Sequence, residues 1–186
     1  MTTPISAPEA SAQSGTSPSR HGVAVATAFG LGSLPGAPGT AGSLVSVGLF
    51  AGLQYALEGG VLQFAYLLVL AWLVPLALWS TEHALRRWSG TDPQVIVIDE
   101  IVGQWVTYAG LLLPAVLGWS DGLPGGQWKS LLAGFILFRA FDVVKPFPIR
   151  RSERVAGAAG VVLDDVLAGA YAALGLLLLA WRGWLR

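Results

Sequence analysis

The strongest constraint on the fold is an apolar run from Val61 to Trp79, which contains 19 residues and no charged side chain. In hydrocarbon, backbone N–H and C=O groups must be satisfied within the segment itself, so a run of this length is typical of a membrane-spanning α-helix. Pro75 falls inside the run and is expected to kink it. The sequence therefore predicts at least one helix long enough to cross a bilayer.

Further apolar segments are shorter, and they cover residues 23–29, 43–57, 101–117, 130–141 and 166–181. The segment 130–141 is too short to span, so we expect a re-entrant or buried helix there. The chain is 54% hydrophobic and 12% charged, about half the usual charged share. These features predict an all-α, membrane-embedded bundle of about five apolar helices plus a short N-terminal one.

Composition also limits the organisation and the partners of the chain. Residues 1–20 are rich in Ser, Pro, Ala and Thr, which predicts a disordered tail followed by one helical domain over 21–186. The formal net charge is zero, which argues against nucleic-acid binding. The chain has no cysteine, so disulfides, thiolate nucleophiles and zinc–sulfur sites are excluded.

Loop charges predict how the helices would cross. The loops after residues 79 and 141 are basic, with Arg86 and Arg87 in the first and Lys145, Arg150, Arg151 and Arg154 in the second. By the positive-inside rule these loops are cytoplasmic and the loops after residues 57 and 117 are external. The acidic ends of the apolar segments then fall on the cytoplasmic side.

Five of the 11 acidic residues lie at ends of apolar segments, namely Asp99, Glu100, Asp142, Asp164 and Asp165. Ionised groups at such places are costly unless they are paired or bound to a cation. Two ordinary alternatives stay open: the adjacent acids could cap helix N-termini, and Asp142 could pair with Arg139 or Lys145. Because oxygen ligands without His or Cys favour Mg²⁺ over zinc, the cation expected for these acids is Mg²⁺.

A glycine-rich stretch, GLGSLPGAPGTAGSL, covers Gly30 to Leu44 and leads into the segment 43–57. Backbone N–H groups in such a stretch, next to a helix N-terminus, can approach a phosphate. The stretch lacks the Gly-Lys-Ser/Thr of a nucleotide P-loop, and a plain structural turn is the alternative.

Four motifs in register, GLGSLPGAPGTAGSL, VIDEIVGQW, FRAFDVVKPFPIR and GVVLDDVLAGAYA, resemble the phosphatidylglycerophosphatase A family over about residues 22–182. The resemblance implies an all-α fold with a central helix and a Mg²⁺-dependent phosphatase of the bacterial inner membrane. Its substrate would be phosphatidylglycerophosphate, and its products phosphatidylglycerol and phosphate. With the loop charges, the resemblance implies a multi-pass enzyme of phospholipid biosynthesis with its active site facing the cytoplasm.

Roles for individual residues follow from this resemblance together with the chemistry of the side chains. The metal ligands would be Asp99, Glu100, Asp142, Asp164 and Asp165. The catalytic groups would be Glu100, Asp142, Asp165, Arg139 and Lys145, with Glu100 or Asp165 as general base and the two cations stabilising the phosphoryl oxygens. The substrate would be bound by Gly39, Thr40, Ser43 and Arg150.

Two other functions compete with the phosphatase. A small transporter or channel would place acids along an ion path at mid-membrane depth, whereas here they lie at segment ends. A structural membrane subunit would use the acids only as helix caps. A CDP-alcohol transferase is excluded, since Asp121-Gly122 does not continue into the required motif.

Overall fold

The computed structural model describes residues 17–88, 94–118, 127–152 and 154–185. Every regular element within these ranges is helical, which confirms the predicted all-α class. Most of the predicted tail, residues 1–16, lies outside the described residues. In chain order the elements are α1 (Arg20–Ala26), η1 (Leu31–Ser33), α2 (Pro38–Ala56), α3 (Gly59–Arg87), α4 (Ile98–Thr107), α5 (Ala109–Val116), α6 (Gln127–Val144), α7 (Ile149–Ser152) and α8 (Ala158–Trp181).

Two helices begin earlier than the apolar pattern suggests. α2 begins at Pro38 rather than near residue 43, since proline at the first helical position loses no intrahelical hydrogen bond. α8 begins at Ala158 rather than at residue 166, so Asp164 and Asp165 lie well inside the helix. The interpretation of these two acids as N-terminal caps is therefore wrong, whereas Asp99 and Glu100 do occupy the first turn of α4.

Two other segments differ in length or continuity. The segment expected over 130–141 is an 18-residue helix, α6, because Lys129, Arg139 and Asp142 interrupt the hydropathy but not the helix. The segment expected over 101–117 is divided at Tyr108 into α4 and α5. Tyr108 donates its backbone N–H to the carbonyl of Trp105 rather than continuing the α-helical ladder.

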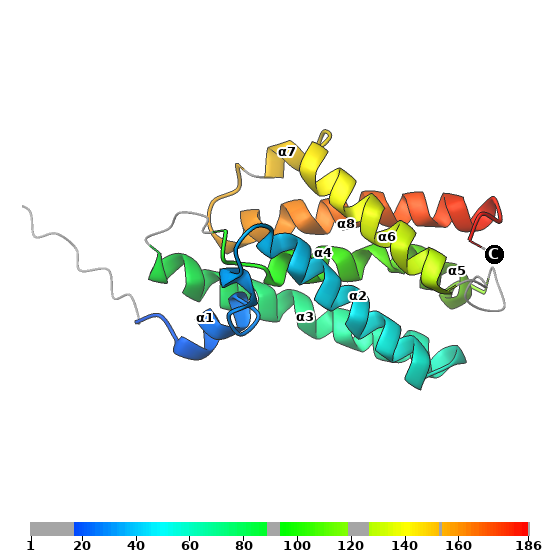
Figure 1. Cartoon of the computed structure of the whole chain (residues 1–186), viewed down its shortest axis with the longest axis horizontal. Coiled ribbons are helices and arrows are strands. Elements are labelled where there is room, and N and C mark those ends of the chain that lie inside the picture. Colours follow the sequence, from blue (N-terminus) through cyan, green and yellow to red (C-terminus); the bar gives the residue numbers. More distant parts are fainter. Residues whose placement is uncertain (1–16, 89–93, 119–126, 153, 186) are drawn as a thin grey trace, which may run out of the picture.

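The central element of the bundle is α4, which contacts α1, α2, α3, α5, α6 and α8. Figure 1 shows it running behind α2 and α6, along the middle of the molecule. Its most extensive contact is with α8, where two glycines let the backbones touch. A Cβ on Gly103 would lie 2.6 Å from the carbonyl oxygen of Asp165, and a Cβ on Gly169 would collide with the carbonyl oxygen of Gly103. The glycines therefore hold the Asp165 turn of α8 against the start of α4.

Beyond the first turns of α4, the core is aromatic. The rings of Phe50 and Tyr108 stack with centroids 4.3 Å apart, and those of Tyr66 and Trp105 stack at 5.6 Å. Phe50 also meets Tyr66 and Trp105 edge-on. The Tyr66 hydroxyl donates a hydrogen bond of 2.9 Å to the carbonyl of Trp105. This cluster joins α2, α3 and α4 through rings that are almost fully buried.

Two helices, α3 and α8, are long and apolar enough to cross a membrane, which supports membrane association. α2, α4 and α8 begin at the same end of the bundle, the end at which α3 and α6 finish (Figure 1). We call it the acidic end, because Asp99, Glu100, Asp142, Asp164 and Asp165 all lie in the turns that meet there.

Candidate active site

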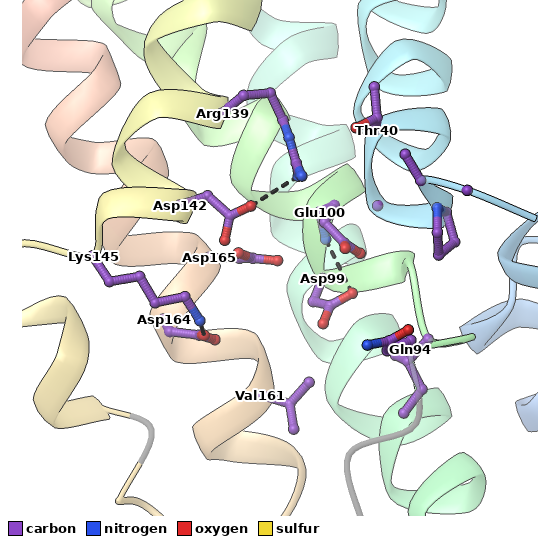
Figure 2. Close-up of a pocket in the computed structure, with 15 residues that line it drawn as sticks. Thr40, Gln94, Asp99, Glu100, Arg139, Asp142, Lys145, Val161, Asp164 and Asp165 are labelled. Atoms are coloured by element: carbon purple, nitrogen blue, oxygen red, sulfur yellow. Dashed lines mark hydrogen bonds and ion pairs between the residues drawn. The ribbon is translucent and has the colours of Figure 1, made fainter.

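A cavity of about 380 Å³ opens at the acidic end, and all five acids named from the sequence line it. They come from three helices, α4, α6 and α8, that meet only in the folded chain (Figure 2). Gly39 and Thr40 from the start of α2 line the same cavity, as do Arg139 and Lys145. The structure therefore places carboxylates, cations and a helix N-terminus around one space.

Three of the carboxylates form a close cluster. One oxygen each from Asp99, Glu100 and Asp165 can be chosen so that all three lie within 4.8 Å of one another. Asp99 is 8% exposed and Asp165 is 4% exposed. α4 supplies the first two acids from its first turn, and the glycine contact with α8 brings in the third. This spacing allows three oxygen ligands to reach one cation.

The cluster is electrostatically incomplete by itself. Oε2 of Glu100 is buried and has no hydrogen-bond partner within the described residues. Burial and the neighbouring Asp99 and Asp165 carboxylates make a charge on Glu100 costly unless a cation is bound. Asp99 Oδ1 accepts a 3.1 Å hydrogen bond from the backbone N–H of Glu100, so this acid satisfies one free N–H of the first turn of α4. A buried group of like charges with an unsatisfied oxygen fits a bound cation.

The other two acids are ion-paired. Asp142 Oδ2 lies 2.8 Å from a terminal nitrogen of Arg139, three residues earlier on α6, so the local pairing considered for Asp142 is present. Lys145 instead reaches across to α8, and its Nζ lies 2.6 Å from Asp164 Oδ2. Lys145 has a left-handed φ of 44° directly after the end of α6. Both cations border the cavity, where they can meet an anionic substrate as well as their acids (Figure 2).

The glycine-rich stretch contributes its last part to the cavity. Residues 36–40, which include the first turn of α2, form one wall. A Cβ on Gly39 would collide with Oε1 of Glu100, so any larger residue where α2 begins against α4 would displace this carboxylate. The free N–H groups and the dipole of this helix start favour an anion in the cavity.

Two residues expected to bind substrate lie elsewhere. Ser43 is fully buried, and its hydroxyl donates a 3.0 Å hydrogen bond to the carbonyl of Gly39. Arg150 is exposed on α7 and does not line the cavity. Conversely, Gln94 and Val161 line it although sequence reasoning did not select them. Neither shows a local signal, since one precedes α4 in a loop and the other is an aliphatic residue of α8.

An apolar helical bundle whose cavity combines a carboxylate cluster with two cationic side chains has the make-up of a phosphoryl-transfer site. The chain belongs to the phosphatidylglycerophosphatase A family, whose model matches residues 24–180. This membership confirms the predicted activity: the chain is a phosphoric monoester hydrolase that converts phosphatidylglycerophosphate to phosphatidylglycerol.

Three relatives cover most of the chain. Phosphatidylglycerophosphatase A of Escherichia coli K12 is 31% identical, over 86% of this chain and 83% of its own. The enzyme of the same name from Haemophilus influenzae is 34% identical, over 81% and 83%. A Bacteroides thetaiotaomicron protein named "Putative phosphatidylinositol-3-phosphatase" is 34% identical, over 88% and 96%. No solved structure shows significant similarity to the chain.

Proposed function

We propose that phosphate release takes place in the acid-lined cavity and depends on Mg²⁺ held by Asp99, Glu100 and Asp165. The close approach of these three carboxylates, with one buried oxygen unsatisfied, is the observation that supports the proposal. When bound, Mg²⁺ would supply a Lewis acid that polarises the phosphate and lowers the pKa of a water. Oxygen-only donors suit this ion.

Arg139 and Lys145 would bind the phosphoryl oxygens of the substrate. Their ion pairs with Asp142 and Asp164 fix the direction of both cations toward the cavity. The sequence suggested that all five acids bind metal, but a carboxylate already paired to a cation is a weaker ligand. We therefore assign Asp142 and Asp164 to positioning the two cations, and the metal to the three-acid cluster.

The first turn of α2 would hold the phosphate from the opposite side. Gly39 gives the substrate access to the backbone, and the Thr40 hydroxyl is available as a further donor. One carboxylate of the cluster, Glu100 or Asp165, would accept the proton of the attacking water. Because Asp165 is almost wholly buried, few bulk waters compete for its oxygens.

In the bilayer we propose a multi-pass arrangement with the acidic end at the cytoplasmic face and residues 21–186 as one helical domain. The end of α3 and α7, whose last turns carry arginines, lie at the acidic end, which agrees with the positive-inside rule (Figure 1). Exposed apolar side chains on α2 and α3 would face lipid. The substrate headgroup would then reach the cavity from the cytoplasmic leaflet.

The deciding experiment measures phosphate release from phosphatidylglycerophosphate by the purified full chain, titrated with Mg²⁺ after treatment with EDTA. Asp99→Asn is expected to raise the Mg²⁺ concentration for half-maximal rate, whereas Asp164→Asn raises KM and leaves the Mg²⁺ requirement unchanged. Glu58→Gln, an exposed acid before α3, is the matched control and should match the wild type. Full activity in EDTA would refute the metal assignment.

A substrate comparison belongs to the same experiment, because the Bacteroides relative is named for a different lipid phosphomonoester. Both lipids are presented at equal concentration in micelles of the same detergent, with phosphatidylinositol 3-phosphate as the second substrate. We expect a kcat/KM lower than that for phosphatidylglycerophosphate. A higher value would reassign the substrate while leaving the site intact. Ion flux into liposomes without phosphate release would favour the channel alternative instead.

A further inference from the structure

A second cavity, of about 370 Å³, lies between the start of α1 and the end of α3. It is lined by Pro18, Arg20, Val23 and Arg87, none of which borders the acid-lined cavity. Neither arginine forms an ion pair within the described ranges, whereas the neighbouring Arg86 is bonded to Glu82. Two uncompensated guanidinium groups on one cavity are suited to a phosphate or another oxyanion.

The two arginines are held in register by the docking of α1 on α3. The backbone N–H of Ser19 donates a 3.2 Å hydrogen bond to Nδ1 of His83. Gly22 packs directly on the same imidazole, since a Cβ there would come within 2.7 Å of it. His83 is one helical turn before Arg87, so these contacts set Arg20 beside the end of α3. The cationic pair is therefore a fixed feature of the fold.

An exposed apolar column on α3 leads to this cavity. Trp72, Leu76 and Trp79 are 71%, 40% and 45% exposed. With His83 and Arg87 they fall within about 80° of one another around the helix, at 100° per residue. The rings of Trp79 and His83 are in edge contact, with centroids 5.1 Å apart. One face of α3 thus changes from apolar to cationic along its length.

We propose that this face and its cavity bind one anionic phospholipid, at a site separate from the catalytic one. The phosphate would lie between Arg20 and Arg87, and an acyl chain would follow the column toward Trp72. The helix rises about 16 Å from Trp72 to His83, close to the roughly 15 Å depth of one leaflet. A free phosphate could bind the same arginines, but it has no acyl chain to contact the apolar column.

The test follows the thermal unfolding midpoint of the full chain in neutral detergent with EDTA. The probes are dihexanoyl phosphatidylglycerol, dihexanoyl phosphatidylcholine and inorganic phosphate. We expect only the phosphatidylglycerol to raise the midpoint at low concentration. The Arg20→Gln/Arg87→Gln double variant should need an at least about tenfold higher phosphatidylglycerol concentration for the same shift, since charge-assisted hydrogen bonds are lost. Arg20→Lys/Arg87→Lys should keep most of the effect.

Two controls separate this site from its surroundings. Arg182→Gln removes an exposed arginine at the other end of the bundle and should behave as wild type. Asp165→Asn alters the catalytic cavity and should leave the stabilisation unchanged. Three results would each overturn the proposal. The double glutamine variant could saturate at the same phosphatidylglycerol concentration as the wild type, Asp165→Asn could lose the effect, or inorganic phosphate could stabilise the protein as much as phosphatidylglycerol. Phosphatase activity retained by the double glutamine variant shows that it is folded.

Discussion

The first and second halves of α4 follow one another along the same helix, but the first is acidic and the second is aromatic. Its first turn holds Asp99 and Glu100, buried beside Asp165 with no cation among the cluster's own side chains. About one and a half turns further on, Trp105 joins an aromatic core together with Tyr108, the residue directly after α4; rings stack in this core and a hydroxyl is hydrogen bonded. Burial is similar in both halves, but the first turn gathers carboxylates of like charge, whereas the rings of the second half pack on one another.

This difference supports the proposed division of the molecule, with catalysis at the acidic half and stability in the aromatic half. Buried carboxylates that repel one another cost free energy of folding, which the proposed cation would offset. Buried aromatic rings contribute favourable packing and need no ligand. We therefore expect substitutions at the acidic end to lower activity without lowering stability. Substitutions in the aromatic core should lower stability without lowering activity.

The largest effect is expected for Asp165→Asn. It removes one carboxylate from the cluster, and we expect kcat/KM to fall about 10³-fold or more, roughly 4 kcal/mol of transition-state stabilisation. In EDTA the unfolding midpoint should not fall, since a like charge has been removed from a buried group. Phosphate release and a thermal melt on the same preparation measure both quantities. A variant with near-normal turnover would end the assignment of this cluster.

Phe50→Ala tests the aromatic half. Phe50 is fully buried and its ring meets those of Tyr66, Trp105 and Tyr108, so the cavity left behind should cost about 3–4 kcal/mol of unfolding free energy. Below its lowered melting point, the variant should hydrolyse substrate at close to the normal rate. Denaturant unfolding in detergent gives the free energy. A loss of turnover equal to that of Asp165→Asn would show that the halves are not separable.

Gly39→Ala sharpens the boundary of the catalytic half. Its Cβ would collide with Oε1 of Glu100, and the displaced carboxylate should lower kcat about 10–100-fold. Gly48→Ala is the matched control on the same helix, because nothing lies within 4 Å of its Cβ. That control should keep full activity and melt slightly higher, as expected for alanine in a helix interior. Equal activity of the two variants would separate Gly39 from the site.

Features of the sequence that are local and chemically unusual proved predictable. Asp99 and Glu100 precede an apolar run, and the structure has them in the first turn of a helix. Asp142 follows Arg139 at helical spacing, and the structure pairs them. In each case the signal lies within one or two turns of chain. The all-α class could be predicted for the same reason, because hydropathy is read over single segments.

What failed depended on contacts between distant segments. The start of α8 was missed because Asp164 and Asp165 resemble caps, whereas the helix begins at Ala158 and buries both acids against other helices. The bond between Lys145 and Asp164 joins two helices and has no local pattern. Ser43 looked like a ligand to phosphate, yet its hydroxyl is used within α2. Side-chain direction in three dimensions decided each of these.

The smallest effect is expected for Tyr66→Phe, which removes one hydroxyl from the aromatic half. That hydroxyl donates to the carbonyl of Trp105 at 2.9 Å in a fully buried place, so its loss should cost about 1 kcal/mol of unfolding free energy. Tyr55→Phe is the control, since Tyr55 is 94% exposed and should change nothing. Activity should be unaltered in both. If Tyr66→Phe instead lowers kcat, the hydrogen bond to α4 also positions the first-turn acids, and the two halves of the helix are coupled.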